Sequence, residues 1–223
     1  LLAPGNHTLF LHGPSGSGKE VFAQSIHLNS PRASENFVAI NCGSLQGNLL
    51  ESELFGHQKG AFTGASQNAV GKIQHANHGT LFLDEIGELS LSSQTRLLRV
   101  IQEKKITPVG SRDEIPVDFR LLCATHKDLK TMVSKGLFRE DLYYRIAVFT
   151  LNIPSLHSRI MDLAMLAQKI WTQFSPEIKL SHADISILKK YTWPGNIRQL
   201  KNILEQYSVY PVSYTHLTLP TTD

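Results

Sequence analysis

A glycine-rich loop near the start of the chain reads Gly13-Pro14-Ser15-Gly16-Ser17-Gly18-Lys19. It follows an apolar run at residues 8–12 and fits the phosphate-binding pattern of a glycine, four residues, a glycine and a lysine. Glycines let backbone N–H groups turn inward around a polyphosphate, and a helix beginning near Lys19 adds its positive end. Glu20 stands where the usual pattern has a metal-binding serine or threonine. The loop predicts a nucleoside triphosphate site, with a glycine turn joining a strand to a helix as the alternative.

The chain has 223 residues, of which 41% are apolar, and its net charge is +3. This length fits one large domain or one and a half ordinary ones, with enough residues for a real core. The mild positive charge does not by itself indicate nucleic-acid binding. Cys42 and Cys123 lie in apolar strand-like runs, so we expect buried free thiols in a reducing compartment. The sequence predicts neither a transmembrane helix nor a secretion signal.

Short apolar runs alternate with helical patterns along the first part of the chain. Strands are expected at residues 9–12, 37–40, 80–83, 117–125 and 148–153. Helices are expected between them at residues 20–28, 45–55, 89–102 and 137–145. The first helix is expected to turn inward Val21, Ala23, Ile26 and Leu28. Continuous apolar runs separated by helices favour an α/β fold, with a parallel sheet covered by helices on both faces.

Beyond residue 159 the strand pattern ends. Three helices are expected there, at residues 160–174, 181–191 and 196–207. We therefore expect an α/β core at residues 1–157, truncated at its N-terminus, followed by a small all-helical subdomain at residues 158–210. Residues 211–223 lose helical periodicity and are rich in threonine and proline, which predicts a disordered tail foreign to the domain.

Two adjacent carboxylates end the third apolar run, which reads Leu81-Phe82-Leu83-Asp84-Glu85. Ligands of open α/β sheets bind at the carboxyl ends of the strands. Phosphoryl transfer needs a metal, neutralised charge and an oriented nucleophile, so Asp84 is expected to hold a hydrated Mg²⁺ and Glu85 to polarise the attacking water. A solvated Asp-Glu pair opening a turn is the alternative, and the presence of the phosphate loop upstream argues against it.

A second glycine-rich segment lies between these motifs and reads Gly60-Ala61-Phe62-Thr63-Gly64-Ala65. Its lead-in is Glu53-Leu54-Phe55-Gly56-His57. With these residues the chain resembles the AAA+ central domain of the NtrC-like bacterial enhancer-binding proteins, whose hallmark hexapeptide it matches letter for letter. The outer glycines would hinge a loop whose tip offers the apolar Phe62 and the hydroxyl of Thr63. A tight glycine turn with Phe62 buried is the alternative.

Further strand ends match the family. Asn41 sits where the family keeps an asparagine that hydrogen-bonds the water-activating glutamate, here Glu85. A strand-end asparagine that caps its own turn is the alternative. Thr125 and His126 occupy the sensor I position, where many members have asparagine in place of His126. This departure leaves two interpretations of His126 open, γ-phosphate sensing or a histidine satisfied locally.

The segment at residues 138–145 is similar to the family's arginine-finger helix. The resemblance implies that Arg139 and Arg145 reach the γ-phosphate in an adjacent subunit and stabilise transition-state charge. It therefore also implies a ring, usually a hexamer. Ordinary pairing with Glu140 or Asp141 on an exposed helix is the alternative.

The sensor II signature of the family is matched by Trp193-Pro194-Gly195-Asn196-Ile197-Arg198-Gln199-Leu200. Arg198 would then point back at the nucleotide, whereas a capped core helix is the alternative. The resemblance covers about residues 5–208 and implies an AAA+ P-loop NTPase core followed by a helical lid. It also implies ATP and Mg²⁺ as cofactors, with the nucleotide bound along the loop from Gly13 to Glu20.

The function implied by the resemblance is ATP-driven activation of sigma-54 RNA polymerase in the bacterial cytoplasm. The hexapeptide would contact sigma-54 in the holoenzyme, and hydrolysis would remodel the closed promoter complex. DNA contact is expected only through a C-terminal helix-turn-helix domain that is missing here, and no membrane contact is expected. Two alternatives are another AAA+ ATPase, of clamp-loader or unfoldase type, and a non-hydrolysing nucleotide-dependent interaction module.

Other candidate sites are weaker. His75 and His78 are three residues apart, but no third ligand stands at suitable spacing, so a hydrophilic helix face is favoured over a metal site. No Gly-x-Ser-x-Gly elbow with a paired histidine indicates a hydrolase nucleophile. Residues 107–116 predict a second surface loop, which in the family accompanies the hexapeptide loop.

Overall fold

The computed structural model describes residues 3–45 and 47–209. The predicted tail at residues 211–223 lies outside this part of the chain. Across the described residues, no helix is both long enough and apolar enough to cross a membrane.

The chain divides into two compact units. The first, the sheet unit, contains the residues up to His12 together with Lys19–Asn152. The second, the helical unit, contains Gly13–Gly18 and the chain from Ile153 onward. The phosphate loop therefore clusters with the helical unit, although the strand before it and the helix after it belong to the sheet unit.

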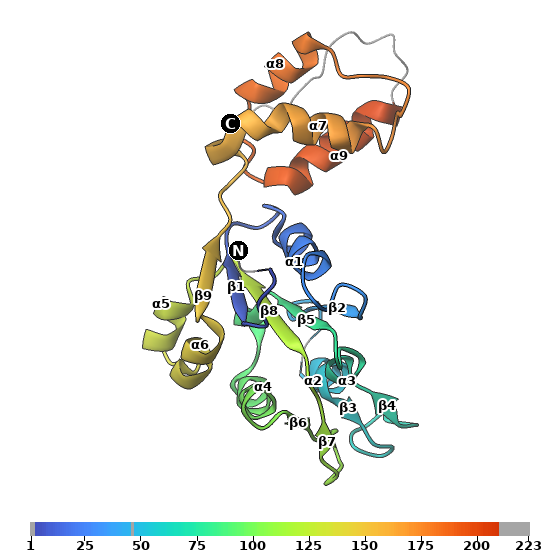
Figure 1. The fold of residues 1–223 in the computed structure, drawn as a ribbon, viewed down its shortest axis with the longest axis vertical. Helices are drawn as coiled ribbons and strands as arrows, with labels where there is room; N and C mark the ends of the chain where they lie inside the picture. Colours follow the sequence, from blue (N-terminus) through green and yellow to red (C-terminus); the bar gives the residue numbers. More distant parts are fainter. Residues whose placement is uncertain (1–2, 46, 210–223) are drawn as a thin grey trace. The chain divides into compact units, whose positions relative to one another are not determined.

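Parallel strands form the centre of the sheet unit. They are β1 (Leu9–His12), β2 (Phe37–Asn41), β5 (Thr80–Asp84), β8 (Arg120–Thr125) and β9 (Phe149–Asn152). They lie side by side in the order β2-β5-β8-β1-β9 (Figure 1), which confirms the predicted parallel sheet. The register pairs Asn41 with Asp84 and His12 with Thr125, so the polar strand ends share one edge.

Helices pack on both faces of this sheet, as the sequence predicts. They are α1 (Lys19–Leu28), α2 (Asn48–Phe55), α3 (Lys72–His75), α4 (Leu91–Glu103), α5 (Leu129–Ser134) and α6 (Glu140–Ile146). Side chains alternate along β8, so Leu122 packs in the cluster that includes α1, and Leu121 packs in the larger cluster with α2–α6. Among the described residues, α1 packs on one face of the sheet and the five helices α2–α6 pack on the other.

The inward face of α1 differs from the predicted one. Val21 and Leu28 are 68% and 66% exposed, so their predicted core positions are wrong. Ala23 is fully buried, and the buried His27 takes the next position on that face, three to four residues later. The His27 ring is satisfied by a hydrogen bond of 2.9 Å between Nδ1 and Thr80 Oγ1, and burial lowers the pKa of His27. A histidine with a buried partner can therefore replace an apolar residue, which periodicity alone cannot reveal.

Two hairpins extend from the sheet unit. The first joins β3 (Gly56–His57) to β4 (Ala69–Val70), and the second joins β6 (Lys105–Ile106) to β7 (Ile115–Pro116). Figure 1 shows both near α2 and α4, away from the arrowheads of the central strands. The hairpins therefore lie at the opposite end of the sheet unit from the edge that carries Asp84.

Local capping explains where two helices begin. Helix α4 begins after Ser90, whose hydroxyl accepts the N–H of Ser93 at 3.2 Å. Helix α5 was not predicted from apolar spacing, and the Asp128 carboxylate starts it by accepting the N–H groups of Lys130 and Thr131. A single capping side chain is thus enough to start a short helix that has little apolar periodicity.

The helical unit has its own apolar core. Its helices are η2 (His157–Asp162), α7 (Leu163–Trp171), α8 (His182–Lys190) and α9 (Asn196–Val209). Their shared core is made of Leu156, Leu163, Ala167, Ile170, Trp171, Leu188, Trp193, Leu200 and Leu204. Helix α8 begins with a capping box, in which Ser181 and Asp184 satisfy each other's backbone N–H groups.

The two cysteines lie in the sheet unit as buried free thiols. Burial, together with the nearby carboxylates of Asp84, Glu85 and Glu88, raises the pKa of Cys42 to about 12. Cys123 is fully buried, and burial raises its pKa as well. Both side chains therefore pack as small apolar groups.

The sheet interior sets the stability of the sheet unit. Leu122 is 0% exposed at the centre of β8, so Leu122→Ala should lower the free energy of unfolding by about 2–5 kcal/mol. Leu49→Ala is the matched control, because Leu49 is 59% exposed and should change stability by less than about 0.5 kcal/mol. Urea denaturation measures both values. Equal losses in the two variants would contradict this assignment of the core.

Candidate functional site

Strand β5 delivers two carboxylates to the edge of the sheet. Asp84 is its last residue, and Glu85 follows with φ of +52°, a left-handed conformation that is uncommon outside glycine. The 3-10 helix η1 (Ile86–Glu88) starts directly after it. This sharp turn lets Glu85 leave the strand direction and face the end of β8, and such backbone strain is typical of functional positions.

Glu85 is held by the end of β8. Its Oε2 accepts hydrogen bonds from Thr125 Oγ1 at 3.1 Å and from the backbone N–H of His126 at 3.3 Å. The same oxygen lies 2.8 Å from Nδ1 of the His126 ring. Its Oε1 lies 3.8 Å from the Nζ of Lys19, the first residue of α1. Burial alone would raise the pKa of Glu85, but the His126 hydrogen bonds and the Lys19 charge lower it below its usual value. The carboxylate is therefore kept ionised.

Asp84 has the opposite electrostatic setting. Burial and the neighbouring Glu85 charge raise the pKa of Asp84, and the opposing effect of Lys19 is smaller. Its Oδ1 accepts the N–H of Glu85 at 3.0 Å. Two adjacent carboxylates with one lysine form an oxygen-rich, electronegative edge, which is the donor set that Mg²⁺ prefers. The described residues thus fit a hydrated Mg²⁺ at Asp84.

The strand-end asparagine bonds within its own turn. Asn41 Oδ1 accepts the N–H of Gly43 at 2.8 Å, as in the capping alternative, and the Asn41 side chain is exposed at the end of β2. Glu85 instead contacts Thr125, His126 and Lys19. His126 thus contacts the expected water-activating carboxylate in this conformation.

The phosphate loop has the backbone that its glycines predict. Gly16 and Gly18 have φ of +72° and +94°, which side chains with a Cβ rarely adopt. Within the described part of the chain, the fully buried hydroxyl of Ser17 has no hydrogen-bond partner. Arg198 Nη1 donates to Ser15 Oγ at 3.0 Å, so Arg198 does point at the loop. A buried hydroxyl awaiting a partner fits a loop built for phosphate oxygens, whereas Glu20 is exposed.

The hexapeptide forms the closed end of the first hairpin. Gly60 N donates to Ala65 O at 2.8 Å, and both outer glycines have positive φ with open space around them. The Phe62 ring lies against His57, with ring centroids 5.0 Å apart and nearly edge to face. Thr63 is exposed. The tip therefore presents a hydroxyl to solvent, while the aromatic ring is half-buried against the stem of the hairpin.

The second hairpin is bonded to the first. Gln58 N donates to Val109 O and Val109 N donates to Gly56 O, each at 2.9 Å. A Cβ on Gly110 would lie 2.8 Å from the Cβ of Ala61, so the two loops touch where Gly110 lacks a side chain. The predicted second loop and the hexapeptide loop thus form one surface element.

The two predicted finger arginines differ in their contacts. Arg139 Nη2 lies 2.6 Å from Asp141 Oδ2, and its Nη1 donates to Thr95 Oγ1 at 3.3 Å. The hydrogen bond and charge of Asp141 raise the pKa of Arg139. Arg145 lies exposed on the last turn of α6. In this chain Arg139 is paired with Asp141 of α6, and Arg145 faces solvent.

Sequence reasoning missed the network between α2 and α4. Glu51 accepts hydrogen bonds from Ser92 and Ser93 at 3.0 and 3.1 Å and pairs with Arg96 at 2.9 Å. Arg96 also donates to Thr107 O at 2.8 Å and stacks 4.4 Å from the Phe55 ring. Its residues come from three separate elements, so no local sequence signal could have revealed it.

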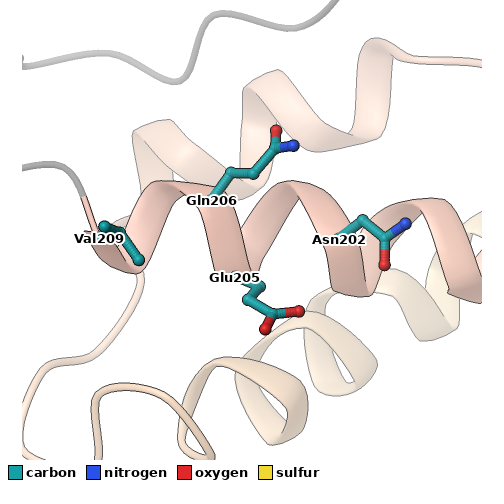
Figure 2. Close-up of a pocket in the computed structure, with 4 residues that line it drawn as sticks. All are labelled: Asn202, Glu205, Gln206 and Val209. Atoms are coloured by element: carbon teal, nitrogen blue, oxygen red, sulfur yellow. The ribbon is translucent and has the colours of Figure 1, made fainter.

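A hollow of about 430 Å³ lies on the surface of α9 and is lined by Asn202, Glu205, Gln206 and Val209 (Figure 2). It contains none of the motif residues described above. All four lining residues project from α9 and are polar except Val209. The motif residues lie elsewhere, at the strand edge, the phosphate loop and the hairpins.

Comparisons with known proteins agree with these motifs. The Sigma-54 interaction domain family matches residues 1–152, and the AAA+ ATPase lid domain family matches residues 157–215. The chain is 48% identical over 211 residues to the transcriptional regulatory protein GlrR of Escherichia coli K12, covering 92% of the chain and 48% of GlrR. It is 48% identical over 206 residues to the Nif-specific regulatory protein of Enterobacter agglomerans, covering 91% and 40%. The chain spans about half the length of the curated relatives it matches.

Solved structures show the same fold. NtrX from Brucella abortus in complex with ATP aligns with a TM-score of 0.83 at 32% identity, over 93% of this chain and 48% of NtrX. Its complex with ADP aligns with a TM-score of 0.85. Hsp104, in a closed state with ATPγS and casein, is more distant and shares the fold alone. It aligns with a TM-score of 0.66 at 17% identity, over 90% of this chain and 39% of Hsp104. The chain therefore belongs to the Sigma-54 interaction domain family, the AAA+ ATPase domain of NtrC-like regulators.

Proposed function

We propose that the chain is the ATP-hydrolysing domain of an activator that remodels sigma-54 RNA polymerase at a closed promoter. The observation that carries the proposal is Glu85, an ionised carboxylate turned out of β5 by a left-handed backbone and placed 3.8 Å from Lys19. This arrangement serves hydrolysis of the β–γ phosphoanhydride of ATP, because the lysine neutralises charge and the carboxylate orients water.

Each motif residue takes a separate role in hydrolysis. The N–H groups of the phosphate loop and Lys19 bind the β- and γ-phosphates, with Arg198 and Thr125 as further contacts. Asp84 would hold a hydrated Mg²⁺, which would supply positive charge for the phosphates when bound. Glu85 polarises the attacking water.

The contacts of Glu85 set a resting state in this proposal. A carboxylate that accepts bonds from Thr125 and His126 has fewer lone pairs for a water. Hydrolysis therefore requires Glu85 to leave His126, and Asn41 on the neighbouring strand is the proposed second partner. His126 and Asn41 are positioning residues in this scheme.

In this proposal, a conformational change at the strand edge is transmitted to the hairpins. Helix α4 follows the turn at Glu85, and its residues Ser93 and Arg96 bind Glu51 of α2, which leads directly into the first hairpin. Arg96 also binds the second hairpin at Thr107. We propose that movement of this network lifts Phe62 from the stem, so that the residues from Gly60 to Ala65 contact sigma-54.

Assembly completes the proposed ATPase. Arg145, exposed on α6, is the proposed finger toward the nucleotide of an adjacent subunit in a ring, usually a hexamer. Arg139 joins it after releasing Asp141, because its guanidinium is paired within its own subunit. A clamp loader or unfoldase would use the same nucleotide site with another client, and the exact hexapeptide match favours sigma-54.

Removal of the proposed water-activating group tests the chemistry. Glu85→Ala should still bind ATP, but its rate of hydrolysis should fall by a factor of about 100 or more, because the attacking water loses its base. Phosphate release and ATP titration measure the two properties. Glu88→Ala is the matched control, since Glu88 is an exposed carboxylate three residues away that pairs with Lys127. Undiminished turnover in Glu85→Ala would remove Glu85 from this role.

The hexapeptide is tested by its exposed hydroxyl. Thr63→Ala should keep ATPase activity and weaken sigma-54 binding about tenfold or more in the presence of a transition-state analogue of ATP hydrolysis. Ser66→Ala, an exposed hydroxyl in the same hairpin, is the control and should bind normally. Native gels or anisotropy with labelled sigma-54 give the affinities. Unchanged binding by Thr63→Ala would exclude the loop as the contact.

Ring formation predicts that ATP turnover per subunit rises with protein concentration, because each site needs an arginine from its neighbour. Arg145→Ala should flatten this dependence and reduce turnover by about 1,000-fold or more, as loss of an arginine finger does. Arg99→Ala, an exposed arginine on α4, is the control. Turnover that is independent of concentration would contradict the shared site, and no turnover at any concentration would favour a non-hydrolysing module.

A further inference from the structure

The outer side of the phosphate loop is hydrogen-bonded to the rest of the helical unit at three consecutive carbonyls. Ser15 O accepts from Asn196 Nδ2 at 2.9 Å. Gly16 O accepts from a backbone N–H in the first turn of α9, also at 2.9 Å. Ser17 O accepts from Arg159 Nη2 at 2.6 Å. The loop is thus held along its length by side-chain and backbone donors from residues far away in sequence.

These hydrogen bonds meet a requirement of any loop that binds an anion through its backbone N–H groups. A loop that turns its N–H groups toward a phosphate must turn carbonyls the other way, and each carbonyl away from water needs a donor. Donors to these carbonyls therefore stabilise the loop conformation that backbone anion binding requires. A loop without them would have to reorganise its carbonyls whenever nucleotide binds.

Asn196 uses both ends of its amide. Its Nδ2 donates to Ser15 O, while its Oδ1 accepts the N–H of Leu156 at 2.8 Å. The side chain is 3% exposed, and the backbone has φ of +54°, a left-handed conformation that asparagine and aspartate tolerate better than most residues. Asn196 therefore ties the phosphate loop to the segment that enters the helical unit.

Arg159 adds a charged donor. It lies in η2 at a residue whose backbone is not helical, with φ of −126° and ψ of 45°. The short Nη2 contact to Ser17 O is charge-assisted. The guanidinium also brings a positive charge to the loop that receives the phosphates.

Close packing joins the loop to α9 as well. A Cβ on Gly16 would lie 2.5 Å from Gly195 O and 3.1 Å from the Cβ of Arg198. Only glycine allows this approach, so Gly16 serves the contact with the helical unit in addition to its positive φ. The loop and α9 behave as one packed element.

We propose that Arg159 and Asn196 are positioning residues for ATP, which hold the carbonyl side of the phosphate loop and so preset its N–H side for the phosphates. The inference rests on the proposed function, because it assumes that this loop binds ATP. It assigns to the helical unit a share of nucleotide affinity that is separate from the direct contact expected of Arg198.

The test measures ATP affinity of the whole chain by titration with a fluorescent ATP analogue and Mg²⁺. Asn196→Asp keeps the size, the acceptor and the tolerance for positive φ but loses the donor to Ser15 O. Asn196→Asp and Arg159→Met should each weaken ATP binding about tenfold. Arg159→Lys, which retains a charged donor, should recover part of the affinity. Asn202→Asp on the exposed side of α9 is the matched control and should bind as the unmodified chain does (Figure 2).

A second readout separates positioning from general damage. The two variants should raise KM for ATP about tenfold while changing kcat at saturating ATP less than about threefold, because the lost energy concerns binding. Circular dichroism verifies that each variant is folded. If Asn196→Asp does not fold, the ATP affinities of Arg159→Met and Arg159→Lys test the inference. Unaltered ATP affinity in folded variants would overturn the inference while leaving the proposed function intact. Failure of the unmodified chain to bind ATP would contradict the proposed function itself.

Discussion

The parallel pairing of β5 between β2 and β8 is the constraint on which the other features depend. Leu81, Phe82 and Leu83 are 0–1% exposed, because helices cover both faces of the sheet. A strand buried in this way can place charged groups only where it ends, so Asp84 and Glu85 lie at the carboxyl edge. There, partial burial strengthens the influence of each neighbour. The pKa of Asp84 is raised and that of Glu85 is lowered, although the two residues are adjacent.

The same sheet separates the proposed catalytic edge from the hairpin proposed to contact sigma-54. The carboxylates lie at one end of the strands, and the two hairpins lie near α2 and α4 at the other (Figure 1). A link between them has to pass through packed elements, and Glu51 is placed for this. It collects hydrogen bonds from α4 while sitting on the helix that leads into the hexapeptide. The proposed coupling therefore depends on a charged hydrogen-bond network between two helices.

The phosphate loop depends on a different set of contacts. Its glycines provide the conformation, but the carbonyls of that conformation are satisfied by Asn196, Arg159 and the start of α9. In the proposed scheme, the helical unit therefore takes part in nucleotide binding. It contributes to the shape of the loop itself, and the clustering of Gly13–Gly18 with that unit has the same cause.

The sequence by itself determined the α/β class and the parallel sheet, because the spacing of apolar residues and glycines records them locally. The family came from the resemblance of short motifs, above all the hexapeptide at residues 60–65. Local patterns also gave most strands to within a few residues. Tertiary structure alone decided which partner each motif residue takes. Glu85 bonds to Thr125 and His126 because β8 lies beside β5 in the sheet. Asn41 bonds to Gly43 and Arg139 to Asp141, so the structure chose between alternatives that the sequence left open. Tertiary structure also decided that His27, and neither Val21 nor Leu28, completes the buried face of α1, because a hydrogen bond to Thr80 from a neighbouring strand satisfies the ring.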